Sequence, residues 1–248
     1  MRFRNVGRNP MMRSIGKQVR SESSEYGASY SGVIMKTTFL LALLALSGLY
    51  TAYNLMTTGN IQGGIFTLIG SAIGAFIAAM IATFKPNLAP FFSIVYALLE
   101  GVVLGAISGI YTLAYGDMIV PTALMATGGV FVAMLLLYRS GIIRVGPMFR
   151  RIMYSLLLGV VFTYLFLFIA GFFGFFESAL GMDIYMLIVI ASAGIASFFL
   201  LIDFDNISEL VESGADKQYE WVFSLSLILT IVWLYIELLK LLAILRER

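Results

Sequence analysis

Residues 200–242, LLIDFDNISELVESGADKQYEWVFSLSLILTIVWLYIELLKLL, decide how this chain folds. One apolar run ends in Asp203 and Asp205, an acidic loop follows, and a second apolar run contains Glu237. The second run carries one polar and aromatic stripe, made of Ser226, Thr230, Trp233, Glu237 and Lys240. Steps of three and four residues keep these side chains on one face of a helix. Because an ionised group inside a bilayer is costly and usually faces protein or water, the stripe predicts a helix buried in a bundle.

The composition indicates an integral membrane protein. The chain has 248 residues, of which 60% are hydrophobic and only 12% are charged, whereas soluble domains carry roughly a quarter charged residues. It contains no cysteine and no histidine. Disulfides, thiolate metal sites, zinc catalysis, Ser-His catalysis and a histidine pH switch are therefore excluded. We expect the lipid bilayer as a partner and no nucleic acid.

The hydropathy pattern divides the chain into a tail and a membrane domain. Residues 1–32 are polar and basic, and we interpret them as a cytoplasmic tail that is disordered or lies on the membrane surface. Residues 33–248 form the transmembrane domain of an all-α protein. Its seven apolar segments lie near 33–55, 61–84, 88–114, 119–138, 152–176, 184–203 and 219–245. Each segment has the ~20 residues that cross a bilayer.

The charges of the links predict the orientation. The links near 56–60, 115–118 and 177–183 contain no lysine or arginine, whereas the other links carry Lys85, Arg139, Arg144, Arg150, Arg151 and Lys217. Basic links stay in the cytoplasm, so the N-terminus is predicted to be cytoplasmic. Seven crossings would put the C-terminus outside, where Arg246 and Arg248 are unexpected. The sequence leaves the side of the C-terminus open.

Glycines and aromatic residues indicate how the segments pack. Gly70 and Gly74 in the second segment, and Gly101, Gly105 and Gly109 in the third, recur every four residues. Such small faces let membrane helices approach closely, so we interpret them as packing surfaces. The fifth segment is aromatic throughout, and we assign it no chemical role.

Four carboxylates inside or beside the apolar segments are candidate functional groups: Glu100, Asp203, Asp205 and Glu237. Two carboxylates that meet in a low-dielectric interior do not both ionise easily, and they can share a proton. Their oxygens also suit a hard cation such as calcium. The set therefore predicts a proton-controlled latch, a cation site, or both.

Each acid also has a purely structural interpretation. Glu237 can pair with Lys240 one helical turn away. Asp203 and Asp205 can cap and solvate a helix end, and Glu100 can hydrogen-bond to Tyr96 or to a neighbouring helix. The loop acids are most simply a solvated face that lacks the ligand spacing of an EF-hand: Glu209, Glu212, Asp216 and Glu220.

Several runs of this chain resemble the Bax inhibitor-1 / YccA-like family, in a bacterial branch. They are DFDNI at 203–207, EWVF at 220–223, TIVWLYIELLKLL at 230–242 and YALLEGVVLGAIS at 96–108, together with the pair Asn9-Pro10 in the tail. The resemblance implies seven helices, with the last one central between two three-helix layers. It also implies a location in the bacterial plasma membrane.

The resemblance further implies a pH-sensitive calcium leak that two aspartates control. The first aspartate carries over to Asp203 or Asp205. The second does not, because Thr230 stands where the family usually has it. We therefore hypothesise that Glu237, with Glu100, supplies the missing carboxylate. Asp203 and Glu237 are then the expected ligands of a bound calcium ion.

Two functions from different classes remain. The first is a pH-sensitive calcium leak channel or cation/proton exchanger that uses intramembrane carboxylates. The second is a non-transporting regulator that binds other membrane proteins, such as a membrane protease. We expect no enzymatic activity, since histidine and a GxGD motif are both absent. We also expect no cofactor, apart from calcium as a permeant or bound ion.

Overall fold

The computed structural model describes residues 27–58, 61–172 and 182–247. Most of the predicted tail, including Asn9-Pro10, lies outside the described residues. So do residues 173–176 at the end of the fifth predicted segment.

Within the described ranges the chain forms seven long α-helices and one 3₁₀ turn. They are α2 (Tyr30–Thr58), α3 (Ile61–Phe84), η1 (Pro86–Leu88), α4 (Ala89–Tyr115), α5 (Ile119–Ser140), α6 (Pro147–Phe172), α8 (Met182–Ser213) and α9 (Tyr219–Glu247). All seven long helices contain a stretch that is long and apolar enough to cross a membrane. This part of the chain has no β-strand, only an isolated bridge between Gly27 and Asp216. The predicted class, an all-α membrane protein with seven spanning helices, is confirmed.

Helix α8 continues well past its apolar run. The expectation that Asp203 and Asp205 lie at a helix end is wrong, because α8 runs on to Ser213. Ile207 and Leu210 are buried in an apolar cluster that also includes residues of α2 and α9, and this contact keeps the extra turns in place. The helix stops before Gly214, whose φ of 66° is a left-handed conformation that glycine adopts easily.

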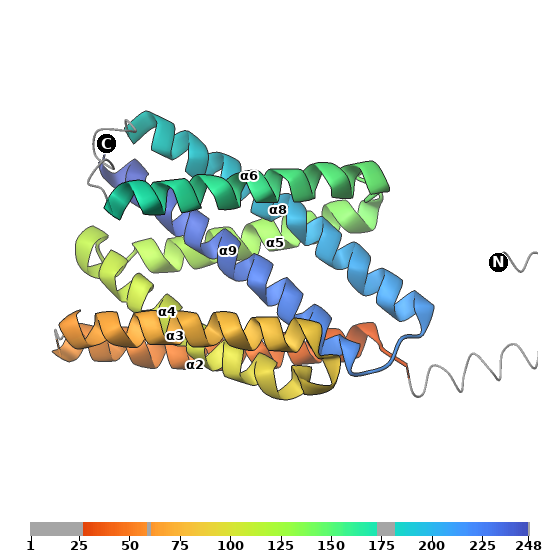
Figure 1. The fold of residues 1–248 in the computed structure, drawn as a ribbon. Coiled ribbons are helices and arrows are strands. Elements are labelled where there is room, and N and C mark those ends of the chain that lie inside the picture. The colour runs from red at the N-terminus through yellow and green to blue at the C-terminus, as the bar shows by residue number, and fades with distance from the viewer. Residues whose placement is uncertain (1–26, 59–60, 173–181, 248) are drawn as a thin grey trace, which may run out of the picture.

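The helices fall into two groups with α9 between them (Figure 1). Helices α2, α3 and α4 pack together on one side, and α8 contacts both α5 and α6 on the other. Helix α9 crosses the middle and contacts α2 and α4 as well as α5 and α8. The position of its side chains follows from this placement. Leu225 and Ile228 join the core around α2 to α4, while Leu227 and Leu234 join the core around α8.

The glycine face of α4 brings two backbones into contact. A side chain on Gly101 or Gly105 would collide with the backbone of α2, at Leu44 and Gly48 respectively. Gly109 also lies against α2. The packing interpretation is confirmed for these three glycines, but it is wrong for Gly70, which has open space around it.

The connections sort to the two ends of the bundle (Figure 1). The start of α2 and the α3–α4, α5–α6 and α8–α9 links lie at the right-hand end of the figure, which we call the basic end. These links carry Lys85, Arg144 and Lys217. The C-terminus of α9 lies at the opposite end, which we call the C-terminal end, together with Arg246. Helix α9 is long and apolar enough to cross a membrane from one of these ends to the other.

Candidate functional site

The polar stripe of α9 faces α8 and α6. Near the basic end, Ser226 and Thr230 donate hydrogen bonds to Asp203 of α8. One turn further along, the indole N–H of Trp233 donates to Ser192 of α8 at 3.1 Å. Glu237 follows and accepts a hydrogen bond from α6. The prediction that this stripe faces the interior of a helix bundle is confirmed, and the hydrogen-bond partners of its polar atoms come mainly from other helices.

Asp203 is buried among hydroxyl groups. Only 4% of its surface is exposed. Its Oδ1 accepts a 2.8 Å hydrogen bond from Ser226, and its Oδ2 accepts a 2.6 Å hydrogen bond from Thr230. No lysine or arginine of the described ranges forms an ion pair with it. Because an isolated ionised carboxylate is very costly in an apolar interior, this group requires a proton or a cation to compensate its charge.

A cavity of about 260 Å³ adjoins Asp203. It lies between α6, α8 and α9. Its polar lining comes from Asp203, Asn206, Ser226 and Thr230, and Trp233 contributes an aromatic wall. The buried carboxylate is therefore next to a space that a small ion or water can occupy.

Asp205 has different surroundings from Asp203. It forms an ion pair with Arg150 of α6 and accepts a 3.4 Å hydrogen bond from Tyr138 of α5. The same arginine donates to Asn206. The side chain of Asp205 is 29% exposed, so this pair lies near the surface at the basic end. The sequence leaves Asp203 and Asp205 as alternatives, and the geometry separates them, since only Asp203 faces α9.

Glu237 is almost completely buried, with 2% of its surface exposed. Its Oε2 accepts a 2.8 Å hydrogen bond from Tyr164 of α6, and its Oε1 lies 3.3 Å from the ammonium of Lys240. Glu237 thus forms the ion pair with Lys240 that the sequence spacing allows. Tyr164 belongs to the fifth predicted segment, to which the sequence analysis assigns no chemical role, so this segment supplies a hydrogen-bond partner for Glu237. A tyrosine in an otherwise apolar run is the signal, since a buried hydroxyl usually needs a partner.

Glu100 stands apart from the other acids. It is half-buried on α4 and makes no hydrogen bond or ion pair with any residue that the structure describes. Its expected hydrogen bond to Tyr96 is not formed. Ser108, on the same helix, instead shares a 2.6 Å hydrogen bond with Tyr235 of α9.

The four sequence-predicted acids do not meet at one point. Thr230, which holds Asp203, lies seven residues from Glu237 on α9, or about 10 Å along the helix axis. Among residues 27–58, 61–172 and 182–247, no three acidic side chains gather closely enough to hold a metal ion. A calcium ion shared by Asp203 and Glu237 stays a prediction.

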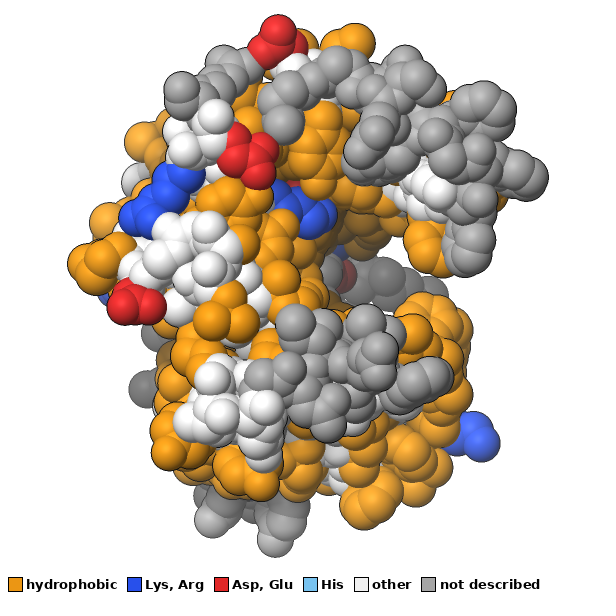
Figure 2. Space-filling view, turned by 90° about the vertical axis from the view of Figure 1, so that its left-hand side faces the viewer, with side chains coloured by type: hydrophobic (Ala, Val, Ile, Leu, Met, Phe, Trp, Pro, Cys, Tyr) orange, Lys and Arg blue, Asp and Glu red, His pale blue; other side chains and the backbone are white. Residues whose placement is uncertain are grey.

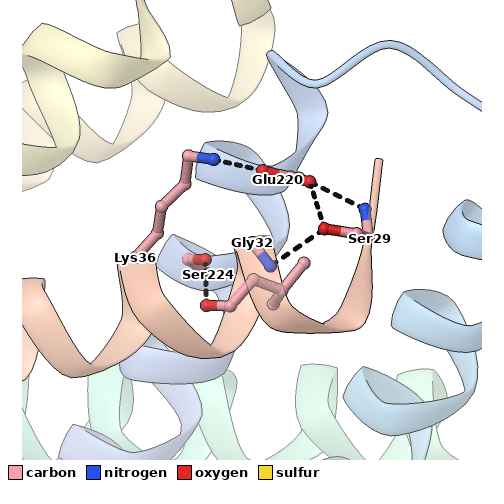
Figure 3. A network of polar contacts seen from close by, with 6 residues as sticks. Ser29, Gly32, Lys36, Glu220 and Ser224 are labelled. Atoms are coloured by element: carbon pink, nitrogen blue, oxygen red, sulfur yellow. Dashed lines mark hydrogen bonds and ion pairs between the residues drawn. The ribbon is translucent and has the colours of Figure 1, made fainter. Parts of the chain in front are cut away.

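Glu220 is a buried acid that the sequence reasoning missed. Its interpretation as part of a solvated face is wrong, because only 2% of its surface is exposed. It pairs with Lys36 of α2 and accepts hydrogen bonds from the backbone N–H and the hydroxyl of Ser29 (Figure 3). Gly32 makes room for its carboxylate. The solvated interpretation does hold for Glu209, whose side chain is 77% exposed.

Comparison with known proteins gives one match. A family model described as "Bax inhibitor 1 like" matches residues 9–247. No curated protein shows a significant match to the chain.

Proposed function

Because the chain belongs to the Bax inhibitor 1 like family, we propose that it is a pH-sensitive calcium leak channel or a cation/proton exchanger of a bacterial plasma membrane. Its seven spanning helices make it an integral membrane protein in contact with lipid. The proposed ion path follows the stripe of α9, from Asp203 with Thr230 to Glu237. Glu100, on the neighbouring helix α4, is a candidate for a further carboxylate on this path.

The observation that carries the proposal is the environment of Asp203. Glu220, Asp205 and Glu237 each have a lysine or arginine partner. Asp203 has only two hydroxyl donors and borders a cavity. Its charge is therefore left for a mobile proton or cation to balance.

This environment supports a pH-sensitive function. A cation binds a carboxylate only in its deprotonated form, so a proton and a cation compete for Asp203. At low pH the bound proton removes the negative charge that attracts the cation. At high pH the carboxylate is free to accept a cation from the adjoining cavity. The rate of cation passage would then depend on pH through one buried group.

The charge distribution supports an N-terminus in the cytoplasm. The basic end carries Lys85, Arg144 and Lys217. By the positive-inside rule this end faces the cytoplasm, and the C-terminal end of α9 faces outward.

Flux measurements on reconstituted protein test the proposal. Liposomes with wild type, Asp203→Asn, Glu237→Gln or Glu212→Gln would be assayed for calcium uptake and internal pH, below, at and above neutral pH. Glu212 is exposed on α8 and serves as the matched control. We expect Asp203→Asn to remove the pH dependence of calcium flux and Glu212→Gln to leave it unchanged. Identical profiles for Asp203→Asn and wild type would exclude Asp203 from the path. The same result for Glu237→Gln would exclude Glu237.

One observation favours the second function, a regulator that binds another membrane protein such as a protease. Gly128 and Gly129 of α5 and Gly159 of α6 are exposed, and a Cβ atom added at any of them would meet no atom of another helix within 4 Å. Small residues on an outer helix face allow a partner helix to approach closely. Wild-type protein that carries no ions in liposomes but co-purifies with a membrane protease would support this function instead.

A further inference from the structure

The ammonium of Lys240 lies between a carboxylate and an aromatic ring. Its Nζ is 3.3 Å from Oε1 of Glu237 and 4.4 Å from the centre of the Tyr164 ring. The hydroxyl of the same tyrosine donates to the other carboxylate oxygen at 2.8 Å. An aromatic face and a carboxylate together are an arrangement that recognises ammonium ions, because both attract a positive charge.

The site is built by several helices. Glu237 and Lys240 come from α9 and Tyr164 from α6, and Tyr111 of α4 and Tyr185 of α8 lie within electrostatic range of Glu237. Lys240 is the more accessible member of the ion pair: 22% of its side chain is exposed, compared with 2% for Glu237.

The position of the site gives it access to one side of the membrane. Lys240 lies seven residues, or about 10 Å along the axis, before the end of α9 at Glu247. Figure 2 shows that this end of the molecule is hollowed between its upper half, with α6 and α8, and its lower half, with α2 to α4. A few charged side chains are visible in the hollow.

We propose that Glu237 and Tyr164 form a binding site for a primary ammonium ion, and that Lys240 is its tethered occupant. The lysine then supplies the charge that a mobile cation would otherwise supply, and it keeps other cations out of this end of the path. This proposal deepens the function proposed above, since it rests on Glu237 lying on the ion path.

The pair of Glu237 and Lys240 differs from an ordinary surface ion pair in the burial of its carboxylate. A pair of residues three positions apart on an exposed helix face contributes little and leaves both groups solvated when it is broken. Here the carboxylate is buried, so removal of the lysine leaves a charge without compensation. The vacated space then favours an external ammonium that can reach the same two groups.

Thermal unfolding in lipid nanodiscs tests the site without any flux. We would compare full-length wild type, Lys240→Ala, Glu237→Gln/Lys240→Ala and the control Lys85→Met, whose lysine is exposed at the basic end. We expect Lys240→Ala to lower the melting temperature by about 5 °C. The double variant should regain part of this loss, because it has no buried charge. Lys85→Met should match wild type.

Chemical rescue identifies the ligand class. Each protein would be titrated with methylammonium chloride, and with sodium chloride at equal ionic strength. We expect methylammonium to restore the melting temperature of Lys240→Ala, and to leave wild type and the double variant at their sodium chloride values. Equal melting temperatures in the two salts for Lys240→Ala would overturn the proposal. If Lys240→Ala does not fold, Lys240→Gln replaces it. Its melting temperature is again compared in the two salts, and a higher value in methylammonium supports the proposal while equal values overturn it.

Flux in liposomes separates this inference from the function it rests on. If the path exists, Lys240→Ala should pass cations several-fold faster than wild type, and the double variant should not. If wild type and every variant carry no cations, the proposed transport function is refuted. The methylammonium rescue still decides whether the ammonium site exists. A rescue without added flux in an active protein would place the site off the path and contradict the gating role of Lys240.

Discussion

Thr230 Oγ1 donates a 2.6 Å hydrogen bond to Oδ2 of Asp203, and this contact joins α9 to α8 at a buried carboxylate. The sequence resemblance described above implies an aspartate at the position of Thr230. An acid and a hydroxyl therefore meet here, where two acids would be expected. The consequence is a single carboxyl group at this point of the bundle, with Ser226 as its second hydrogen-bond donor.

Replacement of Thr230 by valine should destabilise the protein through Asp203. The change keeps the shape of the side chain but removes a donor to a buried carboxylate, which should lower the free energy of unfolding by about 1.5–3 kcal/mol. Thr230→Ser keeps the hydroxyl and serves as the control. The measurement is denaturant unfolding in detergent. In an Asp203→Ala background, Thr230→Val should lower the free energy of unfolding by a clearly smaller amount. An equal loss in both backgrounds would show that Thr230 does not act through Asp203.

Replacement of Gly32 by alanine should disrupt the network around Glu220. The added methyl group would collide with the Glu220 carboxylate and push it away from Lys36 and Ser29 (Figure 3). We expect the free energy of unfolding to fall by about 1–3 kcal/mol, as in other overpacked sites. Gly128→Ala is the control, because that helical glycine has open space around it. Equal stability of the two variants would show that the carboxylate relocates without cost.

The pair of Lys36 and Glu220 should be strongly coupled. Lys36→Met leaves a buried carboxylate, so it should lower the free energy of unfolding by about 3 kcal/mol. Lys36→Met/Glu220→Gln should be less harmful than the sum of the single changes, because neither buried charge remains. A double-mutant cycle measured by chemical denaturation checks this, and additive single changes would rule out the coupling.

Replacement of Gly105 by alanine should separate α4 from α2. A side chain at this position would meet the backbone of Gly48, which has no flexible end to move aside. We expect a loss of about 1–3 kcal/mol in the free energy of unfolding. Gly159→Ala on α6 is the matched control, since the added Cβ atom would meet no other part of the protein within 4 Å. If thermal unfolding gave the same midpoint for both variants, the close contact of α2 and α4 would not limit stability.

Part of the candidate site could be predicted from local spacing. The stripe of α9 could be read from the sequence, because helical periodicity decides which residues share a face. The pairing of Glu237 with Lys240 follows from the same rule, since the two are three residues apart on one helix.

The remaining partners could not be predicted in this way. Tyr164 and Arg150 come from α6, and they reach Glu237 and Asp205 only because that helix packs against α8, which places its side chains near α9. Glu220 looks like a loop acid in the sequence. It is buried because the start of α2 folds over it, and Ser29 lies 191 positions away in the chain.

The sequence by itself determined the membrane class and the seven spanning helices, because both depend on the composition of continuous stretches about 20 residues long. It also determined which face of α9 is polar. Only the tertiary structure decided whether the other buried acids acquire a counter-charge. That outcome depends on which helices meet at each carboxylate: a lysine from the distant α2 compensates Glu220, whereas Asp203 meets only hydroxyl groups.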